Sequence, residues 1–316
     1  MLSRVYRLDG LYRTILILGL ATLGLTAIAS AQPLQQALRA RIGDFQGTVT
    51  LYAKNLESGA TIGMHETDPV RTASTIKLPV MLAVFDAVAR GQAKWTEPLT
   101  VTPGEKVSGT GVLGSEASDD LQLPLRDVVH LMIVLSDNTA TNMIVERFTA
   151  DTVNAYLDKL GIRTTRLLRK IRSDGGALRN AAGYSVAGKL PENQKYGLGV
   201  STPRDMVTIL EKLDRGEIVS PEASKEMLAI MKRCQDGTGI RRRLAGTPVA
   251  NKTGSLDALR SDVGIVYSKS GRIAMAITVD GMPKTDYTPD NVGSILIADL
   301  ARILVDGLAG TPAGSK

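Results

Sequence analysis

Two stretches near opposite ends of the chain alternate apolar and polar residues, and they constrain the fold more than any other feature of the sequence. Residues 46–65 (QGTVTLYAKNLESGATIGMH) follow this pattern with many β-branched residues and are interrupted at ESGA. Residues 261–280 (SDVGIVYSKSGRIAMAITVD) repeat the pattern, with the interruption at Ser270-Gly271. Such alternation on both sides of a turn signal is typical of a β-hairpin. We therefore expect an antiparallel sheet built from both ends of the chain.

The middle of the chain has the apolar spacing of helices instead. Apolar residues recur at helical intervals in residues 74–90, 125–135, 139–148, 151–161 and 203–216. Residues 291–308 have the same spacing and start with Asn291, a residue type that commonly caps helices. The pattern predicts an α/β protein of the α+β type, in which helices flank an antiparallel sheet and an all-helical lobe is inserted. We expect the sheet lobe at about residues 32–66 and 230–316, and the helical lobe at about residues 67–229.

The N-terminus has the pattern of a secretory signal peptide. Arg4, Arg7 and Arg13 precede an apolar run at residues 14–29, which leads into Ala29-Ser30-Ala31. A basic start, a short apolar segment and a small-x-small site predict cleavage after Ala31. A membrane anchor is the alternative, but the run is shorter than the roughly 20 residues of a membrane span. We therefore expect a signal peptide at residues 1–31, a domain at residues 32–316, no membrane anchor after cleavage and a periplasmic location.

Composition excludes several function classes. The formal net charge is +6 without a long Lys/Arg run, and only 4% of the residues are aromatic, so we expect no nucleic-acid partner. Cys234 is the only cysteine, and we expect it to be a small half-buried residue rather than a reactive thiol. His65 and His130 are the only histidines and lack zinc-ligand spacing, so we expect no metal and no cofactor. The absence of G-x-S-x-G also argues against a Ser-His-Asp hydrolase.

Ser74 and Lys77, in the stretch ASTIKLPV, admit two interpretations. Ser74 can be the N-cap of a helix, with Lys77 an ordinary surface cation. Alternatively, Ser74 is a nucleophile and Lys77 activates it, because residues three apart share one face of a helix and a serine hydroxyl needs a base beside it. S-x-x-K alone is expected about once by chance in a chain of this length, so the motif by itself favours capping.

Two further motifs change this balance. Ser136-Asp137-Asn138 (SDN) follows the predicted helix at 125–135, and Lys252-Thr253-Gly254 (KTG) precedes the second predicted hairpin. The order S-x-x-K, S-D-N, K-T-G is the signature of serine β-lactamases and penicillin-binding proteins. With the blocks VRTASTIKLPVMLAV, LRDVVHLMIVLSDNTATNMIVERF and VANKTGSLDALRSDVGIV, the chain resembles class A β-lactamases and their relatives. The resemblance covers about residues 45–308 and implies a class A β-lactamase-like fold.

The resemblance also implies roles for individual residues. It makes Ser74 the nucleophile, Lys77 its activating base and Ser136 the relay that passes a proton to the departing amide nitrogen. It also implies that Asn138 orients Lys77 and binds the substrate. Lys252 and Thr253 would attract a substrate carboxylate. Gly254 and Ser255 are the other residues implied in substrate binding. Backbone N–H groups of Ser74 and Ser255 would form the oxyanion hole. Two residues close to these motifs in the sequence have roles suggested by residue type alone. We expect Asp137 to cap backbone N–H groups, and Arg260 either to help bind a carboxylate or to be a loop cation.

The loop after SDN departs from the family pattern. Class A β-lactamases place there a glutamate that positions the deacylating water. Alignment of Thr165-Arg166-Leu167 with the family puts Ile171 at this position, and E-x-x-L-N is absent. Asp174 and Glu192 are the acidic residues inside the loop, and we take Glu192 as the candidate catalytic carboxylate.

These observations predict an active-site serine hydrolase of class A β-lactamase type that opens the β-lactam amide through an acyl-enzyme on Ser74. If Glu192 or Asp174 reaches the site, the protein turns over β-lactams; if neither does, the acyl-enzyme persists. The alternatives are a D-alanyl-D-alanine peptidase or other amide or ester hydrolase, and a non-catalytic binding protein with this fold. We expect a monomer whose partner is a small β-lactam or a peptidoglycan-like peptide.

Overall fold

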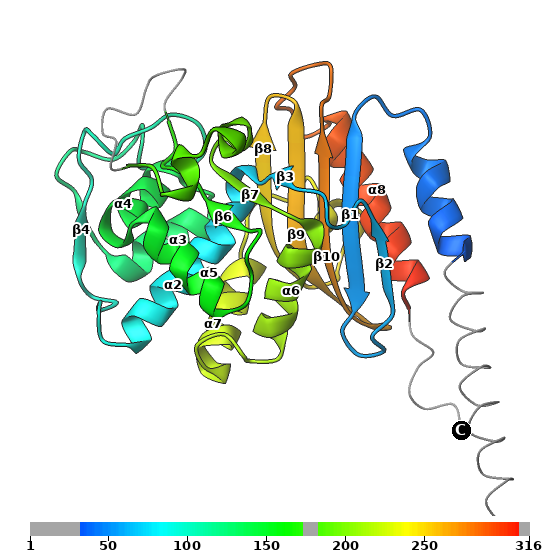
Figure 1. Ribbon diagram of the computed structural model, residues 1–316, viewed down its shortest axis with the longest axis horizontal. Coiled ribbons are helices and arrows are strands. Elements are labelled where there is room, and N and C mark those ends of the chain that lie inside the picture. The colour runs from blue at the N-terminus through cyan, green and yellow to red at the C-terminus, as the bar shows by residue number, and fades with distance from the viewer. Residues whose placement is uncertain (1–31, 173–182, 310–316) are drawn as a thin grey trace, which may run out of the picture. The chain divides into compact units, whose positions relative to one another are not determined.

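The structure is a computed structural model that describes residues 32–172 and 183–309 (Figure 1). The chain divides into two compact units, residues 1–43 and 44–316. In the first unit, residues 32–42 form a helix. The expected signal peptide, residues 1–31, lies outside the described residues and stays a prediction. Within the described ranges, no helix is both long and apolar enough to cross a membrane.

The second unit contains a five-stranded antiparallel sheet in the order β2-β1-β10-β9-β8. Its strands are β1 (Thr48–Asn55), β2 (Thr61–Met64), β8 (Val249–Leu256), β9 (Leu259–Ser268) and β10 (Gly271–Asp280). Strands β1 and β2 form the first predicted hairpin, and β9 and β10 form the second. Strand β1 pairs with β10 from Thr48↔Asp280 to Asn55↔Ile273. The prediction that both ends of the chain complete one sheet is therefore confirmed.

The helices of this unit include every segment for which the sequence predicted one. They are α2 (Lys77–Ala89), α3 (Leu125–Val134), α4 (Asn138–Phe148), α5 (Ala150–Lys159), α6 (Pro203–Asp214), α7 (Pro221–Lys232) and α8 (Val292–Gly307). The Asn291 side chain caps α8 by accepting from the N–H groups of Gly293 and Ser294. Helix α7 was missed, although Ser220 caps it and Pro221 occupies its first position, which is a recognised helix-start signal.

Short elements connect these layers. They are β3 (Val70–Arg71), β4 (Pro98–Thr100), β5 (Gln122–Pro124), β6 (Arg166–Leu167) and β7 (Gly199–Ser201), with the 3-10 helices η1 (Ala73–Ile76), η3 (Ala187–Lys189), η4 (Pro191–Tyr196) and η5 (Ile240–Arg243). Strands β3, β7 and β6 form a small sheet of their own, and β4 pairs with β5. The small sheet holds the segment that leads into η1.

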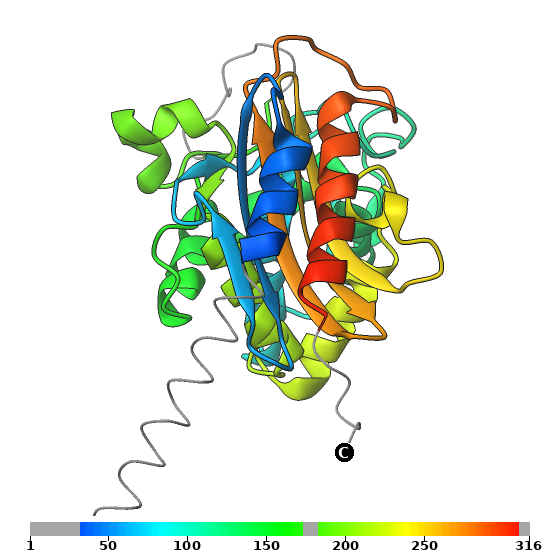
Figure 2. The same ribbon diagram turned by 90° about the vertical axis from the view of Figure 1, so that its right-hand side faces the viewer.

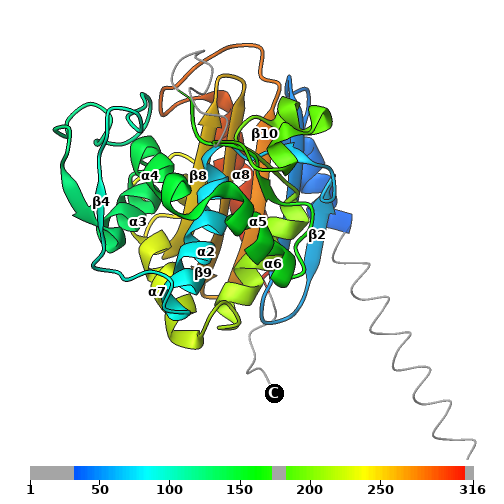
Figure 3. The same cartoon turned by 60° about the vertical axis from the view of Figure 1, so that its left-hand side comes forward.

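Helices cover both faces of the large sheet. Helix α8 runs along one face, against β9 and β10 (Figure 2). On the opposite face, α6 packs against β1 and β10, and the other helices lie beyond it around α2 (Figure 3). Helix α6 belongs to the range expected for the helical lobe but contacts the sheet directly, and the lobe boundaries themselves stay a prediction.

Helix α2 is the centre of the helical lobe because it is apolar on every side. Its buried residues include Leu78, Val80, Met81, Leu82, Val84 and Phe85. A helix that is apolar all round must be surrounded by other elements, and α3, α4, α5 and α7 all contact it. This burial fixes the N-terminus of α2, where Lys77 is the first residue.

Candidate active site

Ser74 lies in η1, immediately before α2. Its position depends on β3, which pairs with β7, and on the Thr72 N–H, which donates to the Gly199 carbonyl at 3.0 Å. The residue before Ser74, Ala73, has φ of +46°, in the left-handed region that non-glycine residues rarely adopt. The N-cap interpretation of Ser74 is wrong, because η1 begins at Ala73 and the cap position is Thr72. The chain therefore presents Ser74 from inside a strained helical turn.

The amino group of Lys77 lies in a closed hydrogen-bond cage. The residue is fully buried, and Nζ donates to the Ser136 carbonyl at 2.7 Å, to Ser136 Oγ at 3.2 Å and to Asn138 Oδ1 at 2.8 Å. Burial lowers the pKa of Lys77 well below the usual lysine value, and the charge of Lys252 lowers it further, while Asp137 opposes the shift. The surface-cation interpretation of Lys77 is therefore wrong.

Ser136 joins the two lysines of the motifs. It lies between α3 and α4 with φ of +55°, and its hydroxyl accepts from Lys252 Nζ at 2.9 Å as well as from Lys77. Lys252 is fully buried and also donates to the Thr253 carbonyl at 2.8 Å. Burial lowers the pKa of Lys252 as well. One hydroxyl thus bridges two buried amino groups.

Asp137 is structural, as predicted. Its carboxylate caps α4 by accepting from the Ala140 N–H at 2.8 Å. It also accepts from the N–H groups of Val112 and Leu113 at 2.6 and 2.9 Å, in the loop that follows β4. The cap therefore sets the start of α4, and with it the position of Asn138 beside Lys77.

Strand β8 forms the opposite wall of the site. It is an edge strand of the large sheet, and its free edge contacts η1. A Cβ at Gly254 would come within 2.8 Å of the Thr72 carbonyl oxygen and 3.0 Å of the Ser74 nitrogen, so only glycine allows this approach. Ser255 follows at the exposed end of the strand. The KTG motif is thereby held against the Ser74 backbone.

A sequence model described as the beta-lactamase enzyme family matches residues 33–308. The chain belongs to this family. Its fold is that of the serine β-lactamase and penicillin-binding-protein-like hydrolases, as the resemblance of the sequence implied.

Individual members of the family and its structural relatives are distant in sequence. A curated relative, beta-lactamase regulatory protein BlaB of Streptomyces cacaoi, is 24% identical over 88% of this chain and 98% of that protein. A β-lactamase structure from Sphaerobacter thermophilus has a TM-score of 0.74, 28% identity, and coverage of 88% of this chain and 98% of that one. A mutant of PBP-A, solved as an acyl-enzyme complex with penicillin G, has a TM-score of 0.73, 30% identity, and coverage of 86% and 94%.

The loop in which β-lactamases of class A carry their glutamate is anchored at Ile171. The Asn142 side chain accepts from the Ile171 N–H at 2.8 Å and donates to the Ile171 carbonyl at 3.0 Å. Asn142 is one helical turn beyond Asn138 on α4, so Ile171 is bound to the same helix face that carries the Asn138 side chain of the Lys77 cage. Asn142 was missed in the sequence, although its spacing from Asn138 was a usable signal.

Of the described carboxylates near this loop, two pair with Lys170 and a third, Glu192, is exposed. Lys170 donates to Glu105 at 3.0 Å and also to Glu146, so these two carboxylates hold the loop to the helical lobe. Glu192 is exposed on η4, and among the described residues no hydrogen bond or ion pair links it to the Lys77 cage. Asp174 lies outside the described residues. A catalytic role for Glu192 stays a prediction.

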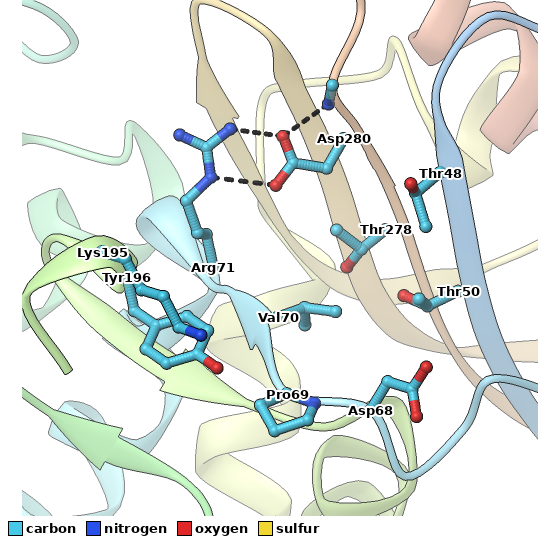
Figure 4. Close-up of a pocket in the computed structure, with 11 residues that line it drawn as sticks. Thr48, Thr50, Asp68, Pro69, Val70, Arg71, Lys195, Tyr196, Thr278 and Asp280 are labelled. Carbon is cyan, nitrogen blue, oxygen red and sulfur yellow. Dashed lines mark hydrogen bonds and ion pairs between the residues drawn. The ribbon is translucent and has the colours of Figure 1, made fainter. Parts of the chain in front are cut away.

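A cavity lies away from the motif residues. It has a volume of about 500 Å³ and is lined by residues of β1, β3, β10 and η4. Figure 4 shows the Arg71–Asp280 ion pair at one wall, where Arg71 Nε donates to Asp280 Oδ2 at 2.9 Å. Because Arg71 comes three residues before Ser74, this pair ties the nucleophile segment to β10 of the large sheet.

Two other candidates from the sequence have structural roles. Cys234 is buried, and burial raises the pKa of its thiol, so the protonated form is favoured, as expected for an inert residue. Arg260 donates to the Leu256 and Leu259 carbonyls at 2.6 Å each, and also to the Asp286 carbonyl. Arg260 is a buried residue of β9, so the loop-cation interpretation is wrong, and a role in binding a carboxylate stays a prediction.

A buried carboxylate behind β8 predicts a pH effect on stability. Asp262 is fully buried on β9 and accepts from the Ile240 N–H and from Asn251 Nδ2, both at 2.9 Å. Burial raises the pKa of Asp262 to about 7, so the folded state binds more protons than the unfolded state below that pH. We expect the free energy of unfolding to fall as pH rises toward 7, by about 4 kcal/mol for this group. Urea unfolding across this pH range measures the slope. An identical slope for Asp262→Asn, which cannot ionise, contradicts the assignment.

Proposed function

We propose that this protein is an active-site serine hydrolase of class A β-lactamase type that acylates on Ser74 and releases the acyl group slowly. The observation that carries the proposal is the buried cage around Lys77, one helical turn from Ser74 and bounded by Ser136 and Asn138. Burial lowers the pKa of Lys77 and so favours the neutral amine, the form that can take the proton of a serine hydroxyl.

In the proposed acylation step, Lys77 takes the proton of Ser74 Oγ while that oxygen attacks the carbonyl carbon of the substrate. The hydrogen bonds of Lys77 Nζ go to Ser136 and Asn138, so the proposal requires a hydrogen bond between Nζ and Ser74 Oγ to form when substrate binds. Backbone N–H groups of Ser74 and Ser255 then stabilise the oxyanion, each by roughly 3–4 kcal/mol.

Ser136 completes this step by carrying the proton to the leaving nitrogen. Its hydroxyl contacts the amino groups of both Lys77 and Lys252, so it can receive a proton from one and pass its own to the substrate. The C–N bond breaks as the nitrogen is protonated, and the acyl group stays on Ser74 as an ester.

Release of that ester is the slow step of the proposal. Ile171 stands at the position where the resemblance implies a water-activating glutamate, and the hydrocarbon side chain of isoleucine cannot accept a proton. Losing a positioned general base costs about 10²–10⁴ in the step that it serves. The acyl-enzyme should therefore form much faster than it is hydrolysed.

A D-alanyl-D-alanine peptidase is the second candidate function. The apolar Ile171 supports it, because a penicillin-binding protein is acylated by β-lactams without efficient release. The similarity to PBP-A, whose mutant was solved as an acyl-enzyme with penicillin G, points the same way. The third candidate is a non-catalytic binding protein, which the name of the Streptomyces cacaoi relative suggests. We also propose export to the periplasm, where both substrate classes occur.

Pre-steady-state kinetics with a chromogenic β-lactam separates these functions. We expect a burst of one acylation per molecule followed by slow turnover. Rapid linear turnover without a burst contradicts slow release, and hydrolysis of an acyl-D-Ala-D-Ala peptide supports the peptidase. If neither substrate reacts, the non-catalytic binding protein is the candidate that remains.

The proposed base predicts the pH dependence of acylation. Lys77 must be neutral, so the acylation rate should rise with pH through its lowered pKa, well below the usual lysine value. Because the charge of Lys252 contributes to this lowering, Lys252→Gln should move the rising limb to higher pH, whereas Lys252→Arg, which keeps the charge, should not. Stopped-flow acylation rates at saturating β-lactam provide the profile. If the acylation rate rises over the same pH range in Lys252→Gln as in Lys252→Arg, the assignment of Lys77 as the base is contradicted.

A further inference from the structure

The cavity between β1, β3, β10 and η4 has a wall of polar side chains where it meets the large sheet. Thr50 pairs with Thr278 across β1 and β10, and Thr48 pairs with Asp280. Residues two apart on a strand share a face of the sheet, so these side chains lie on one face, and all of them line the cavity (Figure 4). The volume of about 500 Å³ is within the range of about 300–1,000 Å³ for small-molecule sites. The cavity therefore has the size of a binding site and a polar floor.

The Thr50 hydroxyl has no partner in this wall. Thr50 is 4% exposed, and its Oγ1 has no hydrogen bond to any residue that the structure describes. The neighbouring Thr278 hydroxyl, by contrast, lies 2.8 Å from Ser261 Oγ and is hydrogen-bonded to it. Buried polar groups in proteins nearly always have a hydrogen-bond partner, and an unpaired one is destabilising. The unpaired hydroxyl therefore points to a partner inside the cavity, either water or a ligand.

Tyr196 forms the opposite wall of the cavity. It is the last residue of η4 and is half-buried, and Figure 4 shows its ring across the cavity from Thr50 and Thr278. Lys195 Nζ lies 5.0 Å from the centre of this ring. The cavity thus has an aromatic side and a hydroxyl side.

The charged groups of the cavity balance one another. Asp68 and Asp280 each contribute a negative charge to the lining. Arg71 and Lys195 each contribute a positive charge, so the formal charges of the described lining residues sum to zero. Arg71 donates two hydrogen bonds to Asp280, whereas Asp68 and Lys195 are exposed. Because the most deeply buried side chains of the lining are uncharged threonines, a ligand with a net charge would meet no opposite net charge here.

We propose that this cavity is a binding site for a neutral saccharide of one or two sugar rings. A sugar hydroxyl both donates and accepts hydrogen bonds, as a threonine hydroxyl does, so it can pair with Thr50 and with the lone pairs left on Thr278. The C–H face of a sugar ring packs against Tyr196, because the face of an aromatic ring carries partial negative charge. None of the described lining residues belongs to the S-x-x-K, SDN or KTG motifs, so this site does not depend on the proposed reaction.

Isothermal titration calorimetry with two neutral disaccharides, cellobiose and di-N-acetylchitobiose, tests the site on the purified protein. We expect at least one of them to bind once per chain. Thr50→Val removes the unpaired hydroxyl and keeps a branched side chain of the same shape, so it should weaken this binding about 3–10-fold, as for the loss of one hydrogen bond. Tyr196→Ala should weaken it at least as much, because it removes the aromatic wall.

Thr61→Val is the matched control, because Thr61 lies on β2 of the same sheet, is exposed and does not line the cavity. Its dissociation constant for the disaccharide should equal that of the unmodified protein. Thermal unfolding shows whether the Thr50 variant stays folded. Because Thr50→Val removes a buried hydroxyl that has no partner in the described chain, its melting temperature should not fall.

Three results would overturn the saccharide site. If neither disaccharide binds, the cavity holds water only. If the Thr50→Val and Tyr196→Ala proteins bind as tightly as the unmodified protein, the saccharide binds elsewhere. If Ser74→Ala abolishes binding, the saccharide occupies the catalytic site instead. We expect Ser74→Ala to bind with an unchanged dissociation constant, so calorimetry on this variant decides the saccharide site whether or not the unmodified protein is acylated.

Discussion

Replacing Lys77 with methionine should slow acylation of Ser74 by about 10²–10⁴-fold, the range for loss of a positioned general base. Methionine approximates the length of the buried lysine stem but cannot take a proton. Because Lys77 is fully buried in a cage made by Ser136 and Asn138, no solvent-exposed base can replace it directly. The quantity to measure is the rate of covalent adduct formation with a penicillin, by quenched-flow mass spectrometry.

Thermal unfolding provides the control for this variant. Methionine keeps most of the packing of the lysine stem but removes a donor from Ser136 and Asn138, so the melting temperature should fall by no more than a few degrees and the protein should stay folded. A folded Lys77→Met protein that is acylated at the unmodified rate contradicts the assignment of Lys77 as the base.

Introducing a carboxylate at Ile171 should have an effect of similar size on the opposite step. Ile171→Glu should speed hydrolysis of the acyl-enzyme by about 10²–10⁴-fold, because it supplies a base for the attacking water. The backbone of residue 171 is held by Asn142 on both its N–H and its carbonyl, so the new side chain starts from a fixed point on the face of α4 that also carries Asn138. The measurement is the half-life of the adduct after excess penicillin is removed.

Ile171→Gln is the matched variant, because glutamine has nearly the same shape as glutamate and cannot act as the base. It should leave the half-life of the adduct unchanged. Equal acceleration by glutamine and glutamate, or no acceleration by glutamate, contradicts the view that the missing base makes release slow.

The sheet could be predicted from sequence because its signals are local. Alternation in residues 46–65 and 261–280 marks two hairpins whose strands follow one another in the chain, and both hairpins form. The cap at Asn291 likewise marked the start of α8. Helix α7 was not among the predicted helices, although Ser220 and Pro221 mark its start.

The site itself could not be assembled from local patterns. The spacing of Ser74, Ser136 and Lys252 in the sequence does not predict that the Ser136 hydroxyl bridges Lys77 and Lys252. Only the resemblance to the family implied that these residues meet. The local pattern favoured Ser74 as a helix cap, yet the chain enters η1 through a left-handed residue, Ala73, which a short β3 strand and its partner β7 impose.

Residues that approach from distant segments were the least predictable. Asn142 fixes Ile171 across 29 positions of the chain, and Lys252 Nζ reaches Ser136 Oγ across 116 positions. Such contacts depend on how α4 and β8 pack with their neighbours, which is a property of the folded chain. The sequence could give the residue types that perform chemistry, but not the neighbours that decide how fast each step runs.

The mass of the intact protein after exposure to benzylpenicillin tests the central claim most directly. We predict that one penicilloyl group is added per chain, that peptide mapping locates it on Ser74, and that it persists after the free drug is removed. The Ser74→Ala protein should show no added mass. An adduct on another residue, or one that forms equally on the Ser74→Ala protein, would contradict the account.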